Sequence, residues 1–291
     1  NQPFIIYSEK LIYKNNELIT LLFAGETSAR LYIKQFDNNG NIKHIDSLDI
    51  ESSLIIEPLY SSLYGYIGKT KTHSISPKIK NGWVQIEVYP KIGKKINLSV
   101  FIEDVNGADI LFVESTDTFN AYVSAYGLPT HYSRKLSPLG AFTRPKSMPQ
   151  NYKIISSNDL EGISCNSHLV NADLVWKKFL NKNKINFKSV SDNYLDDYKN
   201  FNNCKTLIFG SHNEYWTHQK AKNILNFVND GGHVIFLGGN TAWRAVERHN
   251  DFDILYGDDL RDNGFEDIIN ELLGSYFDSN GYDTYAAYKI S

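Results

Sequence analysis

The sequence predicts two regions of different class: an N-terminal β-sandwich over residues 1–107 and a doubly wound α/β domain over residues 108–291. Two observations carry this division. In the first region, short apolar stretches with period-two alternation recur between turn signals, which is typical of strands covering one core. In the second, unalternated apolar strands alternate with helical patterns, which is typical of a parallel sheet covered on both faces. A chain of 291 residues can bury both cores.

The composition is that of an ordinary soluble globular protein, with 42% hydrophobic and 22% charged residues. The net charge is -3 and no block of Lys or Arg is present, so we expect no nucleic-acid partner. No apolar run reaches the roughly 18 residues of a membrane span, so we expect no membrane insertion. Only Cys165 and Cys204 are present, which excludes a disulfide scaffold and favours a reducing, cytoplasmic location.

The β region contains about seven candidate strands. Its clearest strands are Trp83–Tyr89 and Ile96–Glu103, in which every second residue is aliphatic. The run Asp37–Asn41 is a strong turn between two earlier strands. This number of strands fits an immunoglobulin-like sandwich, which serves either as a supporting module or as a carbohydrate- or partner-binding module. The other candidate strands are residues 3–9, 17–25, 29–36 and 52–58.

The α/β region is built from unalternated strands with helices between them. One helix is expected from a Ser167 cap to about Lys182, and another from a Thr217 cap to Gly231-Gly232. An acidic helix is expected over Asp262–Leu273, followed by ragged strands. The expected inward residues are Leu169, Ala172, Val175, Trp176 and Phe179 in the first helix and Ala221, Ile224, Leu225 and Val228 in the second. The predicted strands are 110–114, 152–156, 185–190, 205–209 and 233–237.

Three polar loops follow strands of this predicted sheet, over residues 115–122, 210–214 and 238–240. Because the carboxyl ends of parallel strands meet at one edge, where such sheets bind ligands, we expect these loops to converge. The stretch from Thr206 to Val246 supplies two of them, as polar elbows on either side of a helix. We therefore predict that this stretch forms one wall of a site.

The usual catalytic motifs are absent from this sequence. It contains no G-x-S-x-G elbow, Walker loop, dinucleotide fingerprint, zinc cluster or H-E-x-x-H. Neither cysteine follows a nucleophile elbow, so an inert thiol is favoured over a catalytic one. What remains is Glu214, with His212 two residues before it and several tyrosines nearby in the topology. Carboxylate and phenolate are hard donors that suit trivalent iron, although a capping Glu and packed Tyr residues explain the same pattern.

The strings ADILFVESTDTFNAYVSAYG, THYSR, GSHNEYW and DGGHVIFLGGNTAWRAV resemble the large (beta) subunit of N,N-dimethylformamidase and its relatives. The resemblance covers Ala108 to Val246 closely, and the paired elbows are its most specific part. It implies a β-sandwich followed by a class I glutamine-amidotransferase-like α/β domain. It also implies an enzyme that hydrolyses small amides with a mononuclear Fe(III) held by two tyrosines and one glutamate.

The resemblance assigns individual residues to this iron site. Glu214 becomes the carboxylate ligand and Tyr122 the first phenolate. Tyr132 is our choice for the second phenolate, with Tyr126 as the alternative. The iron would polarise the amide carbonyl or supply a hydroxide.

Four further residues complete the predicted site. His212 and Asn240 are expected to stabilise the developing oxyanion, although a structural hydrogen bond and a turn position are their alternative roles. Trp216 and Trp243 are expected either to line the substrate pocket or to pack beneath it. The resemblance also implies a small subunit as partner and a homo-oligomer.

Two departures from the family leave the activity open. Asn213 stands where relatives often have Asp, and Val123 stands where Asn is common. The family's glycine-rich C-terminal segment, which bears an acidic residue, is not found before Ser291, so we expect either a fragment or a shortened relative. The alternative to a hydrolase is a non-catalytic module that binds carbohydrate or protein with the same two domains.

Overall fold

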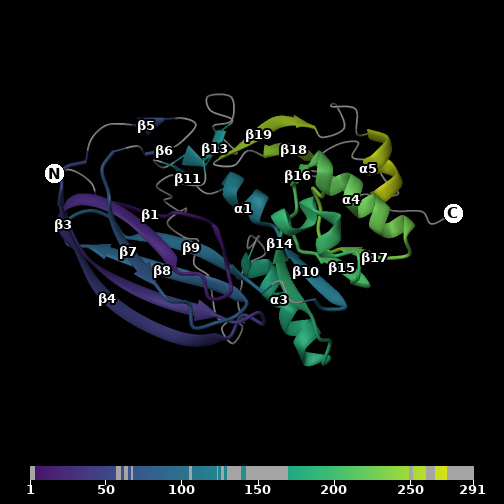
Figure 1. Cartoon of the computed structure of the whole chain (residues 1–291), viewed down its shortest axis with the longest axis horizontal. Helices are drawn as coiled ribbons and strands as arrows, with labels where there is room; N and C mark the ends of the chain where they lie inside the picture. Colours follow the sequence, from purple (N-terminus) through teal and green to yellow (C-terminus); the bar gives the residue numbers. More distant parts are fainter. Residues whose placement is uncertain are drawn as a thin grey trace, which may run out of the picture.

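The computed structural model is a mixed α/β protein in which an N-terminal curled β-sheet precedes a parallel sheet with helices (Figure 1). Within the described part of the chain, no helix is both long and apolar enough to cross a membrane. The structure describes residues 4–56, 60–61, 65–66, 68–104, 107–122, 124–125, 128–129, 139–141, 170–248, 252–259 and 266–273.

The curled sheet is organised by one long strand, β3 (Ile19–Phe36). The first part of β3 pairs with β1 and β7, and its second part pairs with β4 and β8. The curled sheet therefore has two layers, and β3 belongs to both. β9 continues the sheet from β8, and β2 runs parallel to β9. The remaining strands are β1 (Ile5–Ser8), β2 (Ile12–Lys14), β4 (Ile42–Leu54), β7 (Lys71–Ile75), β8 (Gly82–Pro90) and β9 (Ile96–Glu103), with a separate hairpin of β5 (Tyr60–Ser61) and β6 (Gly65–Tyr66).

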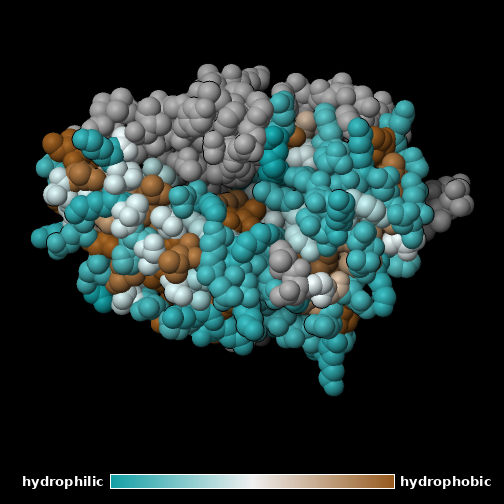
Figure 2. Space-filling model, in the orientation of Figure 1, coloured by the Kyte–Doolittle hydropathy of each residue, from teal (hydrophilic) through white to brown (hydrophobic). Residues whose placement is uncertain are grey.

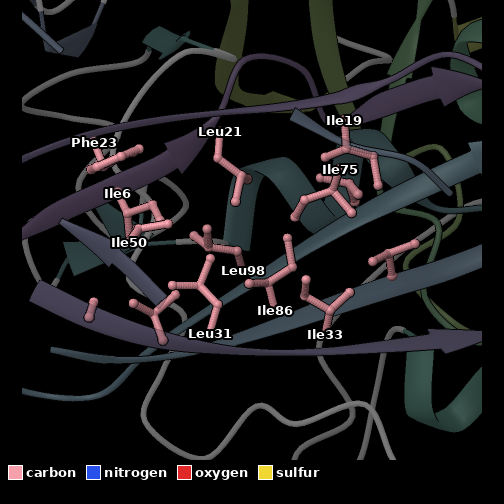
Figure 3. Packing of buried hydrophobic residues seen from close by; sticks show 14 of the residues in the cluster. Ile6, Ile19, Leu21, Phe23, Leu31, Ile33, Ile50, Ile75, Ile86 and Leu98 are labelled. Atoms are coloured by element: carbon pink, nitrogen blue, oxygen red, sulfur yellow. The ribbon is translucent and has the colours of Figure 1, made fainter. Parts of the chain in front are cut away.

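Aliphatic side chains from the two layers meet inside the curl (Figure 3). Ile6 and Leu21 come from one layer, and Leu31, Ile86 and Leu98 come from the other. All five are buried, and the period-two patterns of β8 and β9 predict this for Ile86 and Leu98. The core of this half is therefore made of alternating strand residues.

The strand boundaries in this half differ from the prediction at two places. The strands expected at residues 17–25 and 29–36 are one continuous strand, β3. The 13-residue β4 is mostly exposed, so it lacks the apolar alternation that reveals a strand in a sequence, and only its end was expected. The predicted turn is confirmed, because Asp37 Oδ1 accepts hydrogen bonds from the N–H groups of Asn39 and Asn41, both at 2.9 Å.

The second half contains the predicted parallel sheet, in the order β14-β10-β15-β17. A second four-stranded sheet has the order β13-β19-β18-β16. The strand predicted at residues 152–156 and the strands expected after Leu273 lie outside the described residues. The bounds are β10 (Ile110–Glu114), β14 (Lys188–Ser191), β15 (Thr206–Phe209) and β17 (His233–Phe236), then β13 (Leu139–Ala141), β16 (Tyr215–Thr217), β18 (Arg244–Arg248) and β19 (Phe252–Asp259), with a hairpin of β11 (Ser124–Ala125) and β12 (Leu128–Pro129).

Four α-helices accompany these sheets in the described residues: α1 (Thr116–Tyr122), α3 (Val170–Lys182), α4 (His218–Asn229) and α5 (Glu266–Leu273). Thr217 caps α4 as predicted, since its side chain accepts from Lys220 N. The prediction of a loop over residues 115–122 is wrong, because α1 occupies it. This short segment is helical through its packing rather than its propensity, since Phe119 and Ala121 are buried.

The predicted inward faces of the two longer helices need correction. In α3, Val175, Trp176 and Phe179 are exposed, and Leu169 lies outside the described residues. The buried face consists of Val170, Asn171, Asp173, Leu174, Lys177 and Leu180. This face is favoured because its charged side chains find buried partners on the sheet. In α4, Ala221 and Ile224 are buried as expected, but Val228 is exposed and Phe227 is buried in its place.

One apolar cluster joins the curled sheet to the α/β half. Trp83 of β8 lies at its centre, with ring centroids 5.3 Å from Phe101 and 5.1 Å from Phe119 of α1. Trp83 Nε1 also donates to Glu114 Oε2 at 3.1 Å, at the end of β10. This joint fixes α1 and β10 against the curled sheet. Its members are Leu11, Phe36, Trp83, Phe101, Phe119, Val170 and Leu174.

Candidate functional site

The two polar elbows lie side by side at the carboxyl ends of β15 and β17. His212 forms a parallel bridge with Gly239. The approach is so close that a Cβ on Gly238 would lie 1.9 Å from the carbonyl oxygen of Ser211, so only glycine fits there. The elbows then continue into β16 and β18, which pair in parallel. The stretch from Thr206 to Val246 is therefore one folded unit.

Glu214 lies at the centre of this unit and is fully buried. Its Oε1 accepts a hydrogen bond from Arg244 Nε at 2.6 Å, and its Oε2 lies 3.3 Å from His212 Nε2. Its backbone carbonyl accepts from the N–H groups of Trp243 and Arg244. Burying a carboxylate is costly unless its charge is compensated, and Arg244 supplies the compensating charge. The carboxylate is thus fixed in one orientation beside the His212 side chain, which is 16% exposed.

Asn213 and Trp216 form the inner layer of the first elbow. Asn213 Oδ1 accepts from Trp216 Nε1 at 2.5 Å, and Asn213 Nδ2 donates to Ser115 Oγ at 3.0 Å. The Trp216 ring stacks on Phe209 with centroids 5.1 Å apart and has no exposed surface. Of the two roles expected for Trp216, packing beneath the site is the one that this position favours.

Asn240 and Trp243 belong to the outer part of the second elbow. Asn240 is exposed and has φ 55°, a left-handed conformation that asparagine adopts more readily than most residues. Its turn role therefore has a structural basis, and its exposed amide is also accessible to a ligand. The half-buried Trp243 ring lies under the Arg244 guanidinium, whose central carbon is 4.4 Å from the ring centroid.

The tyrosines of the predicted iron site are placed only in part. Tyr122 is the last residue of α1, and its side chain lies outside the described region, as do Tyr126 and Tyr132 entirely. Among the described residues, no group of three or more His, Cys, Asp or Glu side chains is arranged to hold a metal ion. A set of one glutamate and two tyrosines is not of that kind, so the assignment of these three ligands stays a prediction.

A buried charge cluster supports the first elbow from below. Asp173 Oδ1 accepts hydrogen bonds from Ser211 N at 2.6 Å and Ser211 Oγ at 2.8 Å. A Cβ on Gly210 would lie 2.4 Å from the same oxygen, so a larger residue there would force the Asp173 carboxylate to move. Lys177 forms a buried ion pair with Glu114 beside it. Burial, followed by the charge of Glu114, raises the pKa of Asp173 to about 7.

A second buried cluster ties together α1, α4 and β18. Lys220 Nζ lies 3.0 Å from Asp117 Oδ2 and 2.6 Å from Asp192 Oδ1, and Arg248 reaches Asp117 at 2.9 Å. Burial alone would raise the pKa of Asp117, but Arg248 and Lys220 outweigh it and hold that pKa below its usual range. Burial would likewise lower the pKa of Lys220, but Asp192 and Asp117 raise it.

The opposite end of the parallel sheet offers a cavity without comparable chemistry. A volume of about 760 Å³ is lined by residues that include Asp109, Ile110 and Cys204. Cys204 is a free, half-buried cysteine, and burial raises the pKa of its thiol to about 12, so the inert role expected for it fits. Cys165 lies outside the described residues. Because ligands of such sheets bind at the carboxyl ends of the strands, the elbows remain the candidate site.

Sequence reasoning missed three residues that shape this site: Thr118, Asp173 and Arg244. Arg244 follows the second elbow directly, so its position in the motif was visible, but its pairing with Glu214 depends on the β16–β18 register. Thr118 falls in the segment expected to be a loop. Asp173 was not among the residues predicted to face inward in its helix, because a lone acid in an amphipathic helix usually points to water.

Comparison with known proteins gives one family. Residues 69–257 match the family described as "N,N-dimethylformamidase beta subunit-like, C-terminal", a range that includes α1 and both elbows. No curated protein matches the chain. Among solved structures, a β-glucosidase from Erythrobacter marinus is similar with 8% identity and a TM-score of 0.20, over 34% of this chain and 15% of that chain. A TM-score this low carries no argument about fold or function.

Proposed function

The chain belongs to the N,N-dimethylformamidase beta subunit-like, C-terminal family, and on that premise we propose that it hydrolyses small linear amides. The observation that carries the proposal is the arrangement of the elbows. Their bridge at His212 and Gly239 sets an accessible imidazole against the fully buried, arginine-paired carboxylate of Glu214. A pairing of this kind is a common feature of hydrolytic sites, because it orients a group that can donate or accept a proton.

The donor chemistry of Glu214 fits the iron site that the family implies. The carboxylate is buried and charge-compensated by Arg244 through Oε1, and Oε2 has lone pairs beyond its contact with His212. In the proposal, Glu214 and the phenolates of Tyr122 and Tyr132 hold a mononuclear Fe(III), with Tyr126 as the alternative to Tyr132. When bound, the metal would act as a Lewis acid on the amide carbonyl or on water.

The chain's own residues supply the remaining steps of the proposed reaction. A water oxygen forms a bond to the carbonyl carbon, the C–N bond breaks, and a proton passes to the departing amine nitrogen. His212 and the exposed amide of Asn240 donate hydrogen bonds to the developing oxyanion. Arg244 keeps the Glu214 carboxylate, and with it the His212 ring, in a fixed orientation. The proposal includes the small subunit and the homo-oligomer that the family implies.

The finer fold assignment belongs to the same proposal. We assign residues 1–107 to an immunoglobulin-like sandwich and residues 108–291 to an amidotransferase-like domain. The pairing of β3 with strands of both layers supports the first assignment. The parallel order β14-β10-β15-β17, with polar elbows at the carboxyl ends, supports the second.

The proposal is tested by loading the purified protein with iron. We expect bound iron, a tyrosinate-to-iron absorbance band, and release of dimethylamine from N,N-dimethylformamide. Glu214→Gln, which keeps the shape of the buried side chain, should lose the band and the activity, whereas Glu51→Ala on the exposed face of β4 should keep both. Far-UV circular dichroism checks that both variants fold. A wild-type protein that neither binds iron nor shows the band would exclude the metal site.

The second candidate is a non-catalytic binding module, and one observation favours it. Tyr32 and Tyr89 are exposed on the curled sheet, with ring centroids 5.4 Å apart, and Arg30 and Lys95 lie over the rings. Exposed rings beside charged groups suit the stacking of a sugar. Glycan-array binding that is lost in Tyr89→Ala, by a protein without bound iron, would favour this function over hydrolysis.

A further inference from the structure

We propose that Thr118 is a positioning residue that sets Glu214 relative to α1, the helix that ends at Tyr122. The expected effect of Thr118 on iron binding rests on the proposed function. Its effect on the position of the Glu214 backbone does not. Thr118 is fully buried, and its Oγ1 accepts two hydrogen bonds from consecutive backbone groups: Glu214 N at 3.0 Å and Tyr215 N at 3.1 Å. One hydroxyl therefore satisfies both N–H groups at the point where the first elbow turns into β16.

The contact at Thr118 is the central one of three between α1 and the elbow. On one side of it, Asn213 Nδ2 donates to Ser115 Oγ at 3.0 Å. On the other side, Ala121 packs in a buried cluster with Tyr215 and Val246. The contacts with the elbow thus run from Ser115, directly before α1, to Ala121 near the end of the helix. Glu214 cannot shift relative to α1 without breaking a buried hydrogen bond.

The helix itself is held from two further directions. Phe119 packs on Trp83 of the curled sheet, with ring centroids 5.1 Å apart. Asp117 is paired with the buried Lys220 of α4 at 3.0 Å. Because these contacts fix α1 independently of the elbow, the position of Thr118 determines the position of the Glu214 backbone.

The hydroxyl is the chemically necessary part of this side chain. A threonine oxygen has two lone pairs and can accept both N–H groups at once. Valine has nearly the same shape but no acceptor, so Thr118→Val would leave two buried N–H groups unsatisfied. Residue 122 follows Thr118 by one helical turn, so the same face of α1 carries both positions. The hydroxyl therefore fixes the spacing between the Glu214 backbone and the backbone position of residue 122.

The chain contains a matched control in Thr116. It lies on the same helix, it is buried, and its Oγ1 also accepts a backbone hydrogen bond, but from Asp192 N at 3.1 Å. Thr116→Val therefore removes a buried acceptor from α1 without touching the elbow. If α1 has a purely structural role, the Thr116 and Thr118 variants should change amide exchange in the elbow and iron affinity to a similar extent. If Thr118 positions Glu214, only the Thr118 variant should change them.

The test compares amide hydrogen exchange without added iron and iron affinity with it, in the full chain. In Thr118→Val we expect exchange of the Glu214 and Tyr215 amides to rise about tenfold or more. We expect iron affinity to fall about tenfold or more, as when other partners that orient a metal ligand are removed. Thr118→Ser keeps the hydroxyl and should restore both. Thr116→Val should leave both at wild-type values.

Unchanged exchange at these two amides in Thr118→Val would overturn the inference, and so would an equal fall of iron affinity in Thr116→Val. If the wild-type protein binds no iron, the proposed function falls, and exchange at the two amides alone decides whether Thr118 positions the elbow. If Thr118→Val does not fold, Thr118→Cys replaces it. Its sulfur is a weaker acceptor, so it must show faster exchange at the same two amides, and wild-type exchange there would overturn the inference.

Discussion

The curled sheet and the α/β half bury different kinds of side chain. The curled sheet has a large apolar core, and the lysines that pair with its buried Glu87 and Glu103 remain partly exposed. In the α/β half, Lys177 and Lys220 are fully buried against carboxylates. Apolar residues of the same volume are often at least as stabilising as a buried ion pair. The difference indicates that the buried ion pairs of the α/β half serve to fix the positions of its helices and loops rather than to maximise the stability of the fold.

The location of the buried charges supports this interpretation. Asp173 accepts from the backbone of Ser211 at the start of the first elbow. Lys220 lies in the first turn of α4, directly after β16, and reaches Asp117 on α1. Both clusters therefore fix elements that hold Glu214. On the face seen in Figure 2, hydrophobic surface forms small separate patches over both halves, so the contrast lies in the interiors rather than on this surface.

The largest expected effect breaks the second charge cluster. Lys220→Met leaves the buried carboxylates of Asp117 and Asp192 without their shared cation, and we expect the free energy of unfolding to fall by about 3–5 kcal/mol. Arg30→Met in the curled sheet removes an exposed pair and should cost less than about 1 kcal/mol. Urea unfolding followed by circular dichroism measures both. Equal losses in the two variants would contradict the comparison.

A smaller effect concerns the pH dependence of stability. The pKa of Asp173 is about 7 in the folded protein and about 3.9 in an unfolded chain, because burial and Glu114 disfavour its charge. The folded state therefore binds more protons between these values. The stability from this group is fully present below about pH 4 and is lost as the pH rises through about 7. Lys177 is the cation that limits this shift.

Asp173→Asn cannot ionise, so its stability should not fall over this pH range on account of residue 173. We expect the unfolding free energy of the variant, relative to that of the wild type, to rise from about pH 5 to about pH 8. Asp49→Asn, at an exposed position of the curled sheet, is the control and should follow the wild-type curve. Parallel curves for Asp173→Asn and wild type would show that the carboxyl is ionised throughout.

The two halves also differ in how far their sequences predict them. In the curled sheet, β8 and β9 follow from period-two alternation, because each has one face on a single apolar core. In the α/β half, the parallel strands and the convergence of two elbows follow from unalternated strands that end in polar residues. The Thr217 cap follows from local chemistry alone. Period and capping are local properties, so a single sequence is sufficient to predict them.

The contacts that shape the site could not be predicted in this way. In α3, the apolar stripe with Trp176 and Phe179 suggested the buried face, but the helix buries the face with Asp173 and Lys177. Those two side chains are stable inside only because Ser211 and Glu114 receive them, and no local pattern shows these distant partners. Sequence periodicity therefore predicts the wrong buried face when a helix buries charged residues.

The smallest expected effect tests this correction on α3, the helix that joins the two halves. Trp176 is 38% exposed and its ring contacts Phe179 edge-on, so Trp176→Gln should change the unfolding free energy by no more than about 0.5 kcal/mol. Leu174, two residues earlier, is buried in the joint around Trp83, and Leu174→Ala should cost about 2–5 kcal/mol. Urea unfolding of the two variants measures the difference. A loss above about 1 kcal/mol in Trp176→Gln would mean that the apolar stripe is covered in solution and that the face predicted from periodicity contributes to the core.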